Sequence, residues 1–463
     1  MAETLKKIIE HLNNNDLNRA NELCEKNADK KIQHIIFNIK GVILFKKLEF
    51  KPAENEFLKS IELDKTFIDP YKNLFKLYLR NKDFQSAIDI GKKIIEIDDK
   101  KNPISYFNLA LAHDLNKDYK IAIKLYQISE TLNFKEKKIL FNNLAKCFFS
   151  AQDINNAKKY YLKALEFNQN DKFIINNLLI LYLRIRDKKN IEYFYKKAEE
   201  IDENYIEFKL NKSDYFLYND QIEKAIELLR SIIKDNNNYI AYTKLAKIYS
   251  MINDNQKAIE TIENAIKIYP NIKDLKFTRG MLHLIEGEFE EGWKFYELRD
   301  SIVIDKSFNN IKTWKGENLK GLKILVTSEQ GMGDVIQFSK FLINLSPLCK
   351  EIDFVVYDKL LPIFKKKYKN INICSKSEIF KNEYDYKISI GSLNKYFYKE
   401  KNSDSSDLIN FDQKKKIQWN SRLDKKKINI GLVWSGNFFG PKEPSRSIEL
   451  KNFENLLKLL AKK

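Results

Sequence analysis

A period of about 34 residues governs the first two-thirds of the sequence and constrains the fold more than any other feature. Small or aliphatic residues recur every 33 to 35 positions, and we call these the anchors: Ala20, Ala53, Ala87, Ala122, Ala157, Ile191, Ala225, Ala258 and Gly292. Polar clusters such as 115–118 and 235–238 separate the apolar runs around them. The pattern predicts a stack of antiparallel helix pairs, one per anchor, because a single pair cannot bury its apolar face alone.

Two more positions repeat with the anchors. The residue twelve positions before an anchor is usually small, as at Gly41, Ala110, Ala145, Ser213, Ala246 and Gly280. Phe75 and Leu179 are exceptions. Four residues after an anchor it is often aromatic: Phe57, Tyr126, Tyr161, Tyr195 and Tyr296. Small residues let paired helices approach, and an aromatic ring fills the gap between units. The pattern resembles the tetratricopeptide repeat over about residues 1–299, which implies an α-solenoid that recruits a protein or peptide.

The repeat also explains three of the four histidines. His11, His113 and His283 each lie nine residues before an anchor, so they occupy one equivalent position on the first helix of a unit. We interpret them as helix-interface residues and not as a ligand set. His34 stands alone near the start of a unit.

A row of asparagines is the repeated feature that points most directly to function. Asn73, Asn108, Asn143, Asn177 and Asn211 each lie fourteen residues before an anchor. A stacked row of carboxamides offers a donor and an acceptor to successive peptide groups of an extended chain. Superhelices of the O-linked N-acetylglucosamine transferase type carry a similar asparagine ladder. The alternative is that each asparagine caps or braces its own helix pair.

Composition narrows the function classes. The net charge is +18, but only nine of the 82 basic residues are Arg and no basic block stands out. We therefore interpret the charge as a solvated surface and expect no nucleic-acid partner. The cysteines Cys24, Cys147, Cys349 and Cys374 form no CxxC pair, which indicates reduced thiols without a metal site. No apolar run is long enough for a membrane span and no signal peptide is present, so we expect a cytoplasmic protein.

The pattern changes after residue 300, where an irregular connector (300–322) leads into alternating strands and helices. We predict strands at 323–328, 352–358, 371–373 and 385–391 and a helix at 335–345. Such alternation predicts a parallel α/β sheet.

The turn after the first of these strands reads "EQGMGD", residues 329–334. Gly331 and Gly333 suit a sharp strand-to-helix turn, and Asp334 falls in the first turn of the helix. The dinucleotide fingerprint fails, because Ile336 stands at the third glycine position, and the phosphate-binding P-loop fails as well. Spacing alone favours a tight turn with Asp334 as a helix cap.

Four motifs resemble the C-terminal part of bacterial tetratricopeptide-repeat glycosyltransferases. They are "GWKFYELRD" (292–300), Trp314 to Val326, "EQGMGDVIQF" (329–338) and "WNSRL" (419–423) with the following "INIGLVWSGN" and "RSIEL". That part is similar to heptosyltransferases of glycosyltransferase family 9, which have the GT-B fold of two facing Rossmann-like domains. The resemblance implies transfer of a sugar from a nucleotide sugar to an acceptor, with no cofactor or metal.

The resemblance also assigns site residues. Asp334 becomes the general base that takes the acceptor's hydroxyl proton. The turn around it supplies acceptor or turn candidates, namely Glu329, Gln330, Gly331, Gly333 and Gln337. Candidates for the donor diphosphate follow the start of the second Rossmann-like domain, namely Ser435, Asn437, Arg446 and Ser447. The stretch between Asn437 and Arg446 departs from the family, with Gly440 and Glu443 where relatives tend to have His and Asp.

These patterns predict four segments. Residues 1–299 form the repeat solenoid, 300–322 the connector, 323–425 the N-terminal Rossmann-like domain and 426–463 the start of a second one. Because the second domain stops after one strand and one helix, we expect a fragment of a longer protein or a truncated gene. The leading hypothesis is a glycosyltransferase whose repeats recruit the acceptor. The alternative is a non-catalytic tetratricopeptide scaffold with a vestigial α/β domain.

Overall fold

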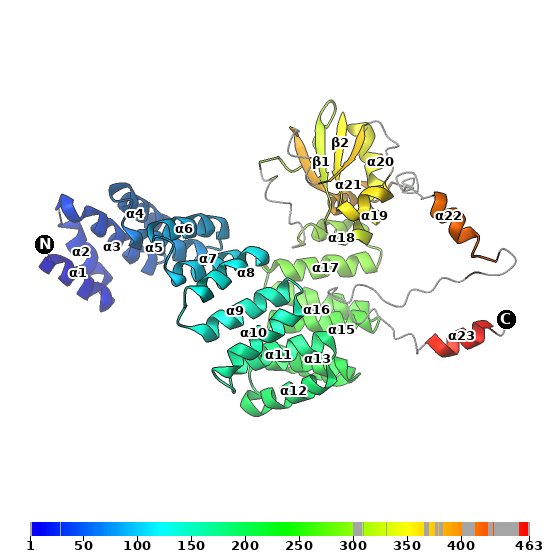
Figure 1. Cartoon of the computed structure of the whole chain (residues 1–463), viewed down its shortest axis with the longest axis horizontal. Helices are drawn as coiled ribbons and strands as arrows, with labels where there is room; N and C mark the ends of the chain where they lie inside the picture. Colours follow the sequence, from blue (N-terminus) through cyan, green and yellow to red (C-terminus); the bar gives the residue numbers. More distant parts are fainter. Residues whose placement is uncertain are drawn as a thin grey trace. The chain divides into compact units, whose positions relative to one another are not determined.

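The computed structural model consists of a helical repeat solenoid followed by a small α/β region with a parallel sheet (Figure 1). It describes residues 2–27, 29–299, 308, 310–329, 331–364, 370–375, 378, 383–400, 413–424, 429 and 453–461. The chain divides into one unit of residues 1–211 with 434–463 and another of residues 212–433. The fold class expected from the sequence is confirmed.

Paired helices make up the repeats, with a first and a second helix in each pair. The first helices are α1 (Ala2–Asn13), α3 (Gln33–Lys46), α5 (Ile68–Arg80), α7 (Pro103–Leu115), α9 (Lys137–Ser150), α11 (Lys172–Ile185), α13 (Ile206–Tyr218), α15 (Tyr239–Met251) and α17 (Lys273–Ile285). The second helices are α2 (Leu17–Glu25), α4 (Phe50–Leu63), α6 (Phe84–Ile97), α8 (Tyr119–Thr131), α10 (Ile154–Glu166), α12 (Lys188–Asp202), α14 (Ile222–Asn236), α16 (Asn255–Ile268) and α18 (Phe289–Tyr296).

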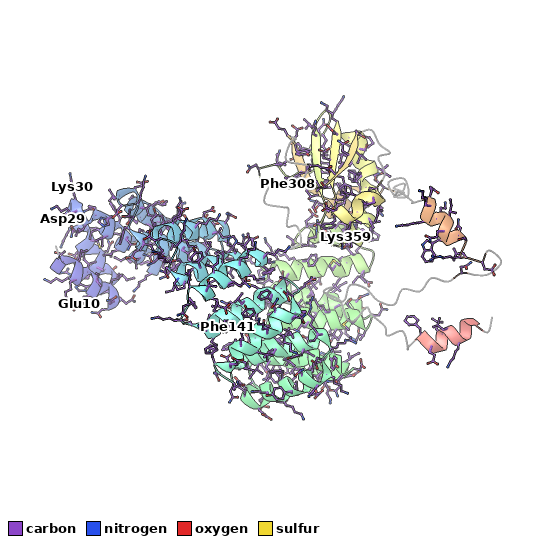
Figure 2. The ribbon with its side chains drawn as sticks, viewed as in Figure 1. Glu10, Asp29, Lys30, Phe141, Phe308 and Lys359 are labelled. Atoms are coloured by element: carbon purple, nitrogen blue, oxygen red, sulfur yellow. The ribbon has the colours of Figure 1, made fainter. Side chains whose placement is uncertain are left out.

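Every anchor lies on a second helix and is buried, as the period predicts. Some of the aromatic residues that follow the anchors pack toward the next unit. Phe57 on α4, for example, shares a core with Leu74 and Leu77 on α5. The centroid of the Tyr126 ring instead lies 5.3 Å from that of the Phe107 ring of its own unit. Other rings close the space within a pair, since the rings of Phe141 on α9 and Tyr160 on α10 have centroids 5.8 Å apart. Figure 2 labels Phe141 among the side chains of the repeats.

Close approach of the paired helices explains the small residues on the first helices. A Cβ atom added at Gly41 would lie 2.5 Å from Cε1 of Phe57, a ring that is itself 1% exposed. We expect Gly41→Val to lower the free energy of unfolding by about 1–3 kcal/mol, as overpacking of a filled core does. Urea denaturation followed by circular dichroism measures this change. Adding Phe57→Leu should restore part of the loss, and no recovery would contradict this account of the glycine.

The turn inside each pair has a backbone signature that the sequence analysis did not predict. The residue five positions before every anchor has a positive φ, and only one of these nine residues is a glycine. They are Asn15, Leu48, Lys82, Lys117, Gln152, Arg186, Asp220, Asn253 and Gly287. The next residue is the N-cap of the second helix. It is an aspartate whose carboxylate accepts a backbone N–H bond in five units, at Asp16, Asp83, Asp153, Asp187 and Asp254. These caps help to offset the strain of left-handed non-glycine residues.

The repeated histidines contact the N-cap residues of the second helices. His11 Nδ1 lies 3.1 Å from Asp16 Oδ2, and His113 Nδ1 lies 3.2 Å from Asp118 Oδ2. His283 makes the equivalent contact with Glu288. Each histidine therefore joins the end of a first helix to the start of the second helix, which confirms that the three are helix-interface residues.

The α/β region contains a four-stranded parallel sheet in the order β3-β2-β1-β4. Its strands are β1 (Lys323–Thr327), β2 (Glu351–Val355), β3 (Ile371–Cys374) and β4 (Tyr386–Ser389). The helix predicted at 335–345 is broken into α19 (Met332–Phe338), a 3₁₀ turn at 339–341 and α20 (Leu342–Leu345). The sheet shares one apolar core with these helices and with α21 (Leu393–Phe397). Two more helices follow, α22 (Gln413–Asn420) and α23 (Glu454–Ala461).

Candidate functional site on the first helices

Three of the five repeated asparagines bond to an asparagine of the preceding unit. Their Nδ2 groups donate to carboxamide oxygens 35 residues earlier in the chain. The pairs are Asn73 with Asn38 at 2.9 Å, Asn177 with Asn142 at 3.1 Å and Asn211 with Asn176 at 2.9 Å. These carboxamides brace neighbouring units, so part of the bracing alternative is correct, although the brace runs between units and not within one.

Asn108 and Asn143 differ from the other three. In each of the three pairs, the accepting asparagine lies fifteen residues before the anchor of its own unit. The unit before Asn108 has Lys72 at this position, and the unit before Asn143 has Phe107. Neither side chain offers a carboxamide oxygen. Within the described residues, Asn108 and Asn143 take part in no carboxamide pair, and both are half-buried. The side chain of Asn143 does meet the buried hydroxyl of Tyr126 on α8 and acts against the rise in its pKa, but a carboxamide keeps a second N–H and an oxygen for another partner. Asn108 and Asn143 are therefore the two asparagines of the row best placed to bond to another molecule.

The pairing leads to a prediction about stability. Asn211→Ala removes the donor that satisfies Oδ1 of Asn176, a residue that is 5% exposed. We expect the free energy of unfolding to fall by about 1–3 kcal/mol, because a buried acceptor loses its hydrogen bond. Asn108→Ala is the matched control and should change it by less than about 0.5 kcal/mol. Equal losses in the two variants, measured by urea denaturation, would contradict the assignment of the braces.

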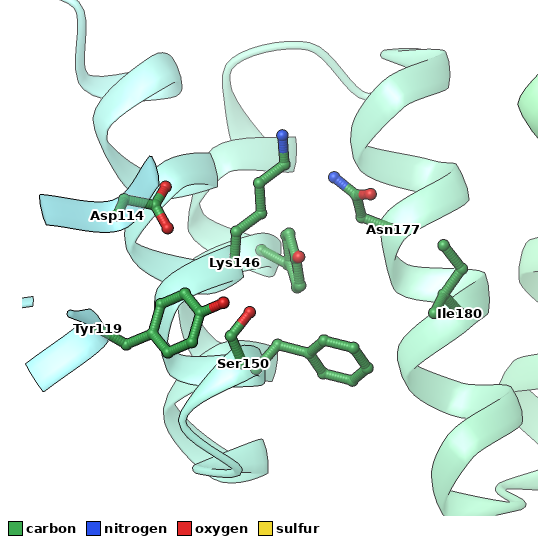
Figure 3. Close-up of a pocket in the computed structure, with 8 residues that line it drawn as sticks. Asp114, Tyr119, Lys146, Ser150, Asn177 and Ile180 are labelled. Carbon is green, nitrogen blue, oxygen red and sulfur yellow. The ribbon is translucent and has the colours of Figure 1, made fainter. Parts of the chain in front are cut away.

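A pocket of about 290 Å³ opens between three consecutive units (Figure 3). The first helices α7, α9 and α11 contribute most of its wall, and α8 and α10 complete it. The lining residues are Asp114, Tyr119, Lys146, Phe149, Ser150, Tyr161, Asn177 and Ile180. Figure 3 shows Asp114 and Asn177 on opposite sides of the space, with Lys146 near one end and Tyr119 and Ser150 near the other. We call this space the α9 pocket.

Asp114 dominates the electrostatics of the α9 pocket. Burial raises the pKa of its carboxyl group, while a hydrogen bond with the Cys147 thiol and the positive charge of Lys146 act in the opposite direction. In the described part of the chain, no basic group forms an ion pair with Asp114. A half-buried carboxylate without a cation is an acceptor that a bound group can satisfy.

No pattern in the sequence indicated Asp114, Lys146, Tyr119 and Ser150 as site residues. They come from three helices of two units, and no single spacing in the sequence relates them. Asp114 and Phe149 do share one repeat position, eight residues before an anchor.

The turn after β1 places Asp334 in the first turn of α19. Its Oδ2 atom accepts a 3.0 Å hydrogen bond from the backbone N–H of Gly331, which is the capping contact favoured by spacing alone. Burial raises the pKa of the Tyr357 hydroxyl, and the nearby charges of Glu329 and Asp334 raise it further. The side chain of Asp334 is half-buried at the carboxyl edge of the sheet.

The two glycines of this turn do not need a positive φ. Gly331 has a φ of −86°, and Gly333 is not among the glycines with positive φ. A Cβ atom at Gly331 would lie 3.1 Å from Oδ2 of Asp334, whereas one at Gly333 would meet nothing within 4 Å. Close approach to the cap, and not backbone conformation, therefore favours glycine at Gly331.

Glu329 has a structural partner in the last repeat. Nε and Nη2 of Arg299 donate to its two carboxylate oxygens at 3.0 and 2.5 Å, and Arg299 and Glu329 are 4% and 5% exposed. The N–H of Gly391 donates to Oε1 of Glu329, and Nη2 of Arg299 also donates to Oγ of Ser392. Burial alone would lower the pKa of Arg299, but the bonds and charge of Glu329 raise it. Glu329 therefore ties the last repeat to the ends of β1 and β4.

The remaining predicted residues divide between exposed and undescribed positions. Gln337 is exposed on α19. The acceptor candidate Gln330 and the donor candidates Ser435, Asn437, Arg446 and Ser447 lie outside the described residues. Among the residues that are described, no group of three His, Cys, Asp or Glu could hold a metal ion, and no helix is both long and apolar enough to cross a membrane.

A comparison of sequences finds a relative of part of the chain. The chain is 26% identical to the protein FlbA of Caulobacter vibrioides over 128 residues, which is 26% of this chain and 21% of FlbA. The chain thus matches about a fifth of the length of this relative.

Among solved structures, a tetratricopeptide repeat protein from Parabacteroides merdae aligns with a TM-score of 0.43 and 18% identity, covering 52% of this chain and 94% of the other. PilF of Pseudomonas aeruginosa aligns with a TM-score of 0.38 and 16% identity, covering 46% and 97%.

A family model matches two of the helix pairs. Residues 140–171 and 239–272 match the tetratricopeptide repeat model, and they correspond to most of α9–α10 and to α15–α16. Both segments have the buried anchor and the small residue twelve positions before it, as the other helix pairs do with few exceptions. Two helix pairs of this chain thus match the tetratricopeptide repeat model, and the other pairs repeat the same buried positions.

Proposed function

We propose that this protein is a scaffold that binds an extended segment of a partner protein across the first helices α7, α9 and α11. The observation that carries the proposal is the pairing of the asparagines. An asparagine of the row braces two units where the preceding unit supplies an asparagine oxygen as acceptor. Among the residues that the structure describes, Asn108 and Asn143 have no such acceptor and form no carboxamide pair. These two lie on α7 and α9, which also form the α9 pocket.

A carboxamide is well suited to a peptide partner. It donates through Nδ2 and accepts through Oδ1, so it can bond to both the C=O and the N–H of a peptide unit without regard to the side chain. Asn108 and Asn143 are one repeat apart, on consecutive first helices. Two such contacts would fix the direction of an extended chain, and the α9 pocket would then receive one of its side chains.

Selection of random twelve-residue peptides on the full-length chain tests this function. Peptides that are enriched are labelled, and their affinity is measured by fluorescence anisotropy. We expect a family of sequences that compete with one another for one site. A failure to enrich any peptide would contradict the proposal.

A glycosyltransferase is the second candidate. It is favoured by one observation, the place of Asp334 at the carboxyl edge of a parallel sheet, where α/β enzymes commonly carry site residues. In this hypothesis Asp334 takes the proton of an acceptor hydroxyl, while Ser435, Asn437, Arg446 and Ser447 meet the donor diphosphate. Turnover of a panel of nucleotide sugars by the wild type and by Asp334→Asn tests it. Equal turnover by both proteins would remove Asp334 from the role of base.

A further inference from the structure

The α9 pocket is built for the end of a single side chain. Its volume of about 290 Å³ is at the lower end of the range for small-molecule sites, which makes it small for a nucleotide or a cofactor. Its wall is about equally polar and apolar, and the polar part contains the hydroxyls of Tyr119 and Ser150 and the carboxamide of Asn177 alongside two charged groups. Phe149 and Ile180 supply apolar surface for a short aliphatic stem.

The two charged groups of the wall have opposite signs. Asp114 presents a carboxylate and Lys146 an ammonium group, and no ion pair joins them within the described residues. A cationic side chain would gain from Asp114 but would be repelled by Lys146, and an anionic one would experience the reverse. A bound side chain that carries both a donor and an acceptor but no net charge can hydrogen-bond to Asp114 and to Lys146 at once.

We infer that the α9 pocket accepts a carboxamide side chain, that of a glutamine or asparagine, from the bound peptide. The amide N–H₂ donates to the carboxylate of Asp114. The amide oxygen accepts from Lys146 or from Nδ2 of Asn177 on the opposite side (Figure 3). This inference rests on the proposed function, since the side chain must arrive as part of a peptide.

The braces of the unit leave Asn177 able to take part. Its Nδ2 donates one hydrogen to Asn142, but a carboxamide has a second N–H and an oxygen with two lone pairs. The brace also holds the carboxamide in place, so little side-chain entropy is lost when a guest binds. The unit-to-unit contact thus orients one wall of the pocket.

Matched peptides test the inference. Starting from the tightest selected peptide, each position is replaced in turn, and the position with the largest effect is then set to glutamine, glutamate, lysine and leucine. We expect glutamine to bind at least about tenfold more tightly than the other three to the wild type. With Asp114→Ala the advantage of glutamine should fall to less than about twofold. Asp114→Asn keeps an acceptor oxygen and should retain part of it.

The outcomes separate this inference from the proposed function. If peptides bind but the position prefers lysine, glutamate or leucine, the carboxamide assignment is wrong while the scaffold function stands. If glutamine is preferred equally by the wild type and Asp114→Ala, the side chain is read elsewhere and the assignment is also wrong. If no peptide binds the wild type, both fail. Unfolding curves for each variant show whether a lost preference reflects a lost fold.

Discussion

Glu329→Ala is expected to lower the free energy of unfolding of residues 212–433 by about 3–5 kcal/mol, the largest loss for any single substitution considered for this chain. The substitution leaves the guanidinium of Arg299 buried without its main counter-charge. It also removes the acceptor for the N–H of Gly391. A buried charge that loses its partner costs far more than the pair itself contributes.

Thermal and urea unfolding, followed by the fluorescence of Trp293 and Trp314, measure this loss. The double variant Arg299→Met with Glu329→Leu removes both charges and should recover much of it, because an apolar pair of similar volume carries no desolvation penalty. Glu290→Ala is the surface control, since its contacts with Lys399 and Tyr398 are exposed, and it should leave the unfolding midpoint unchanged. A midpoint for Glu329→Ala equal to that of Glu290→Ala would contradict the structural role.

The same contact bears on the glycosyltransferase hypothesis. Both carboxylate oxygens of Glu329 are engaged by Arg299, and the residue is 5% exposed. While this ion pair holds, Glu329 cannot contact the acceptor substrate of a glycosyltransferase. Its role in the motif is to attach the last repeat to the sheet. The proposal for Asp334 does not depend on Glu329 and stays a prediction.

The repeats could be predicted from the sequence because their burial is periodic. An anchor such as Ala87 or Ala258 is fully buried in every unit, so any larger or polar residue there would be costly, and the period is written into the sequence. The parallel strands were also predictable, since β1 and β2 are short apolar runs next to turn residues. In both cases local pattern and burial agree.

The turns and the contacts between units could not be predicted in the same way. Leu48 adopts a positive φ although no local preference calls for it, because the backbone hydrogen bonds of the turn, such as that from the N–H of Glu49 to the C=O of Leu44, and the packing of the pair decide the conformation. The buried pair of Arg299 and Glu329 joins residues thirty positions apart across a connector. The row of asparagines could be predicted from the sequence. Which of these asparagines brace two units depends on the residue that faces them in the neighbouring unit.

Replacing Asn108 and Asn143 together by alanine is expected to weaken peptide binding by about ten- to one-hundredfold. Each substitution removes hydrogen bonds worth roughly 1 kcal/mol to the bound chain. The helicity should stay close to that of the wild type, and the unfolding midpoint should fall only slightly, because neither carboxamide pairs with another carboxamide of the described residues and Asn143 loses only its contact with the Tyr126 hydroxyl. Anisotropy titrations with the selected peptides, alongside circular dichroism, measure both quantities.

The braced asparagines provide the matched control. Asn73→Ala lies in the same row but breaks a bond to Asn38, which is 8% exposed, so it should lower stability and leave peptide affinity nearly unchanged. If the double variant at Asn108 and Asn143 binds peptide as tightly as the wild type, the two residues serve the fold and not a ligand.

The position of the bound peptide tests the central claim most directly. A selected peptide carrying a benzophenone group is irradiated on the full-length chain, and the cross-linked residues are identified by mass spectrometry. Binding across the first helices predicts cross-links within α7, α9 and α11, and their loss when Asn108 and Asn143 are replaced. Cross-links confined to the second helices or to the α/β region would contradict it.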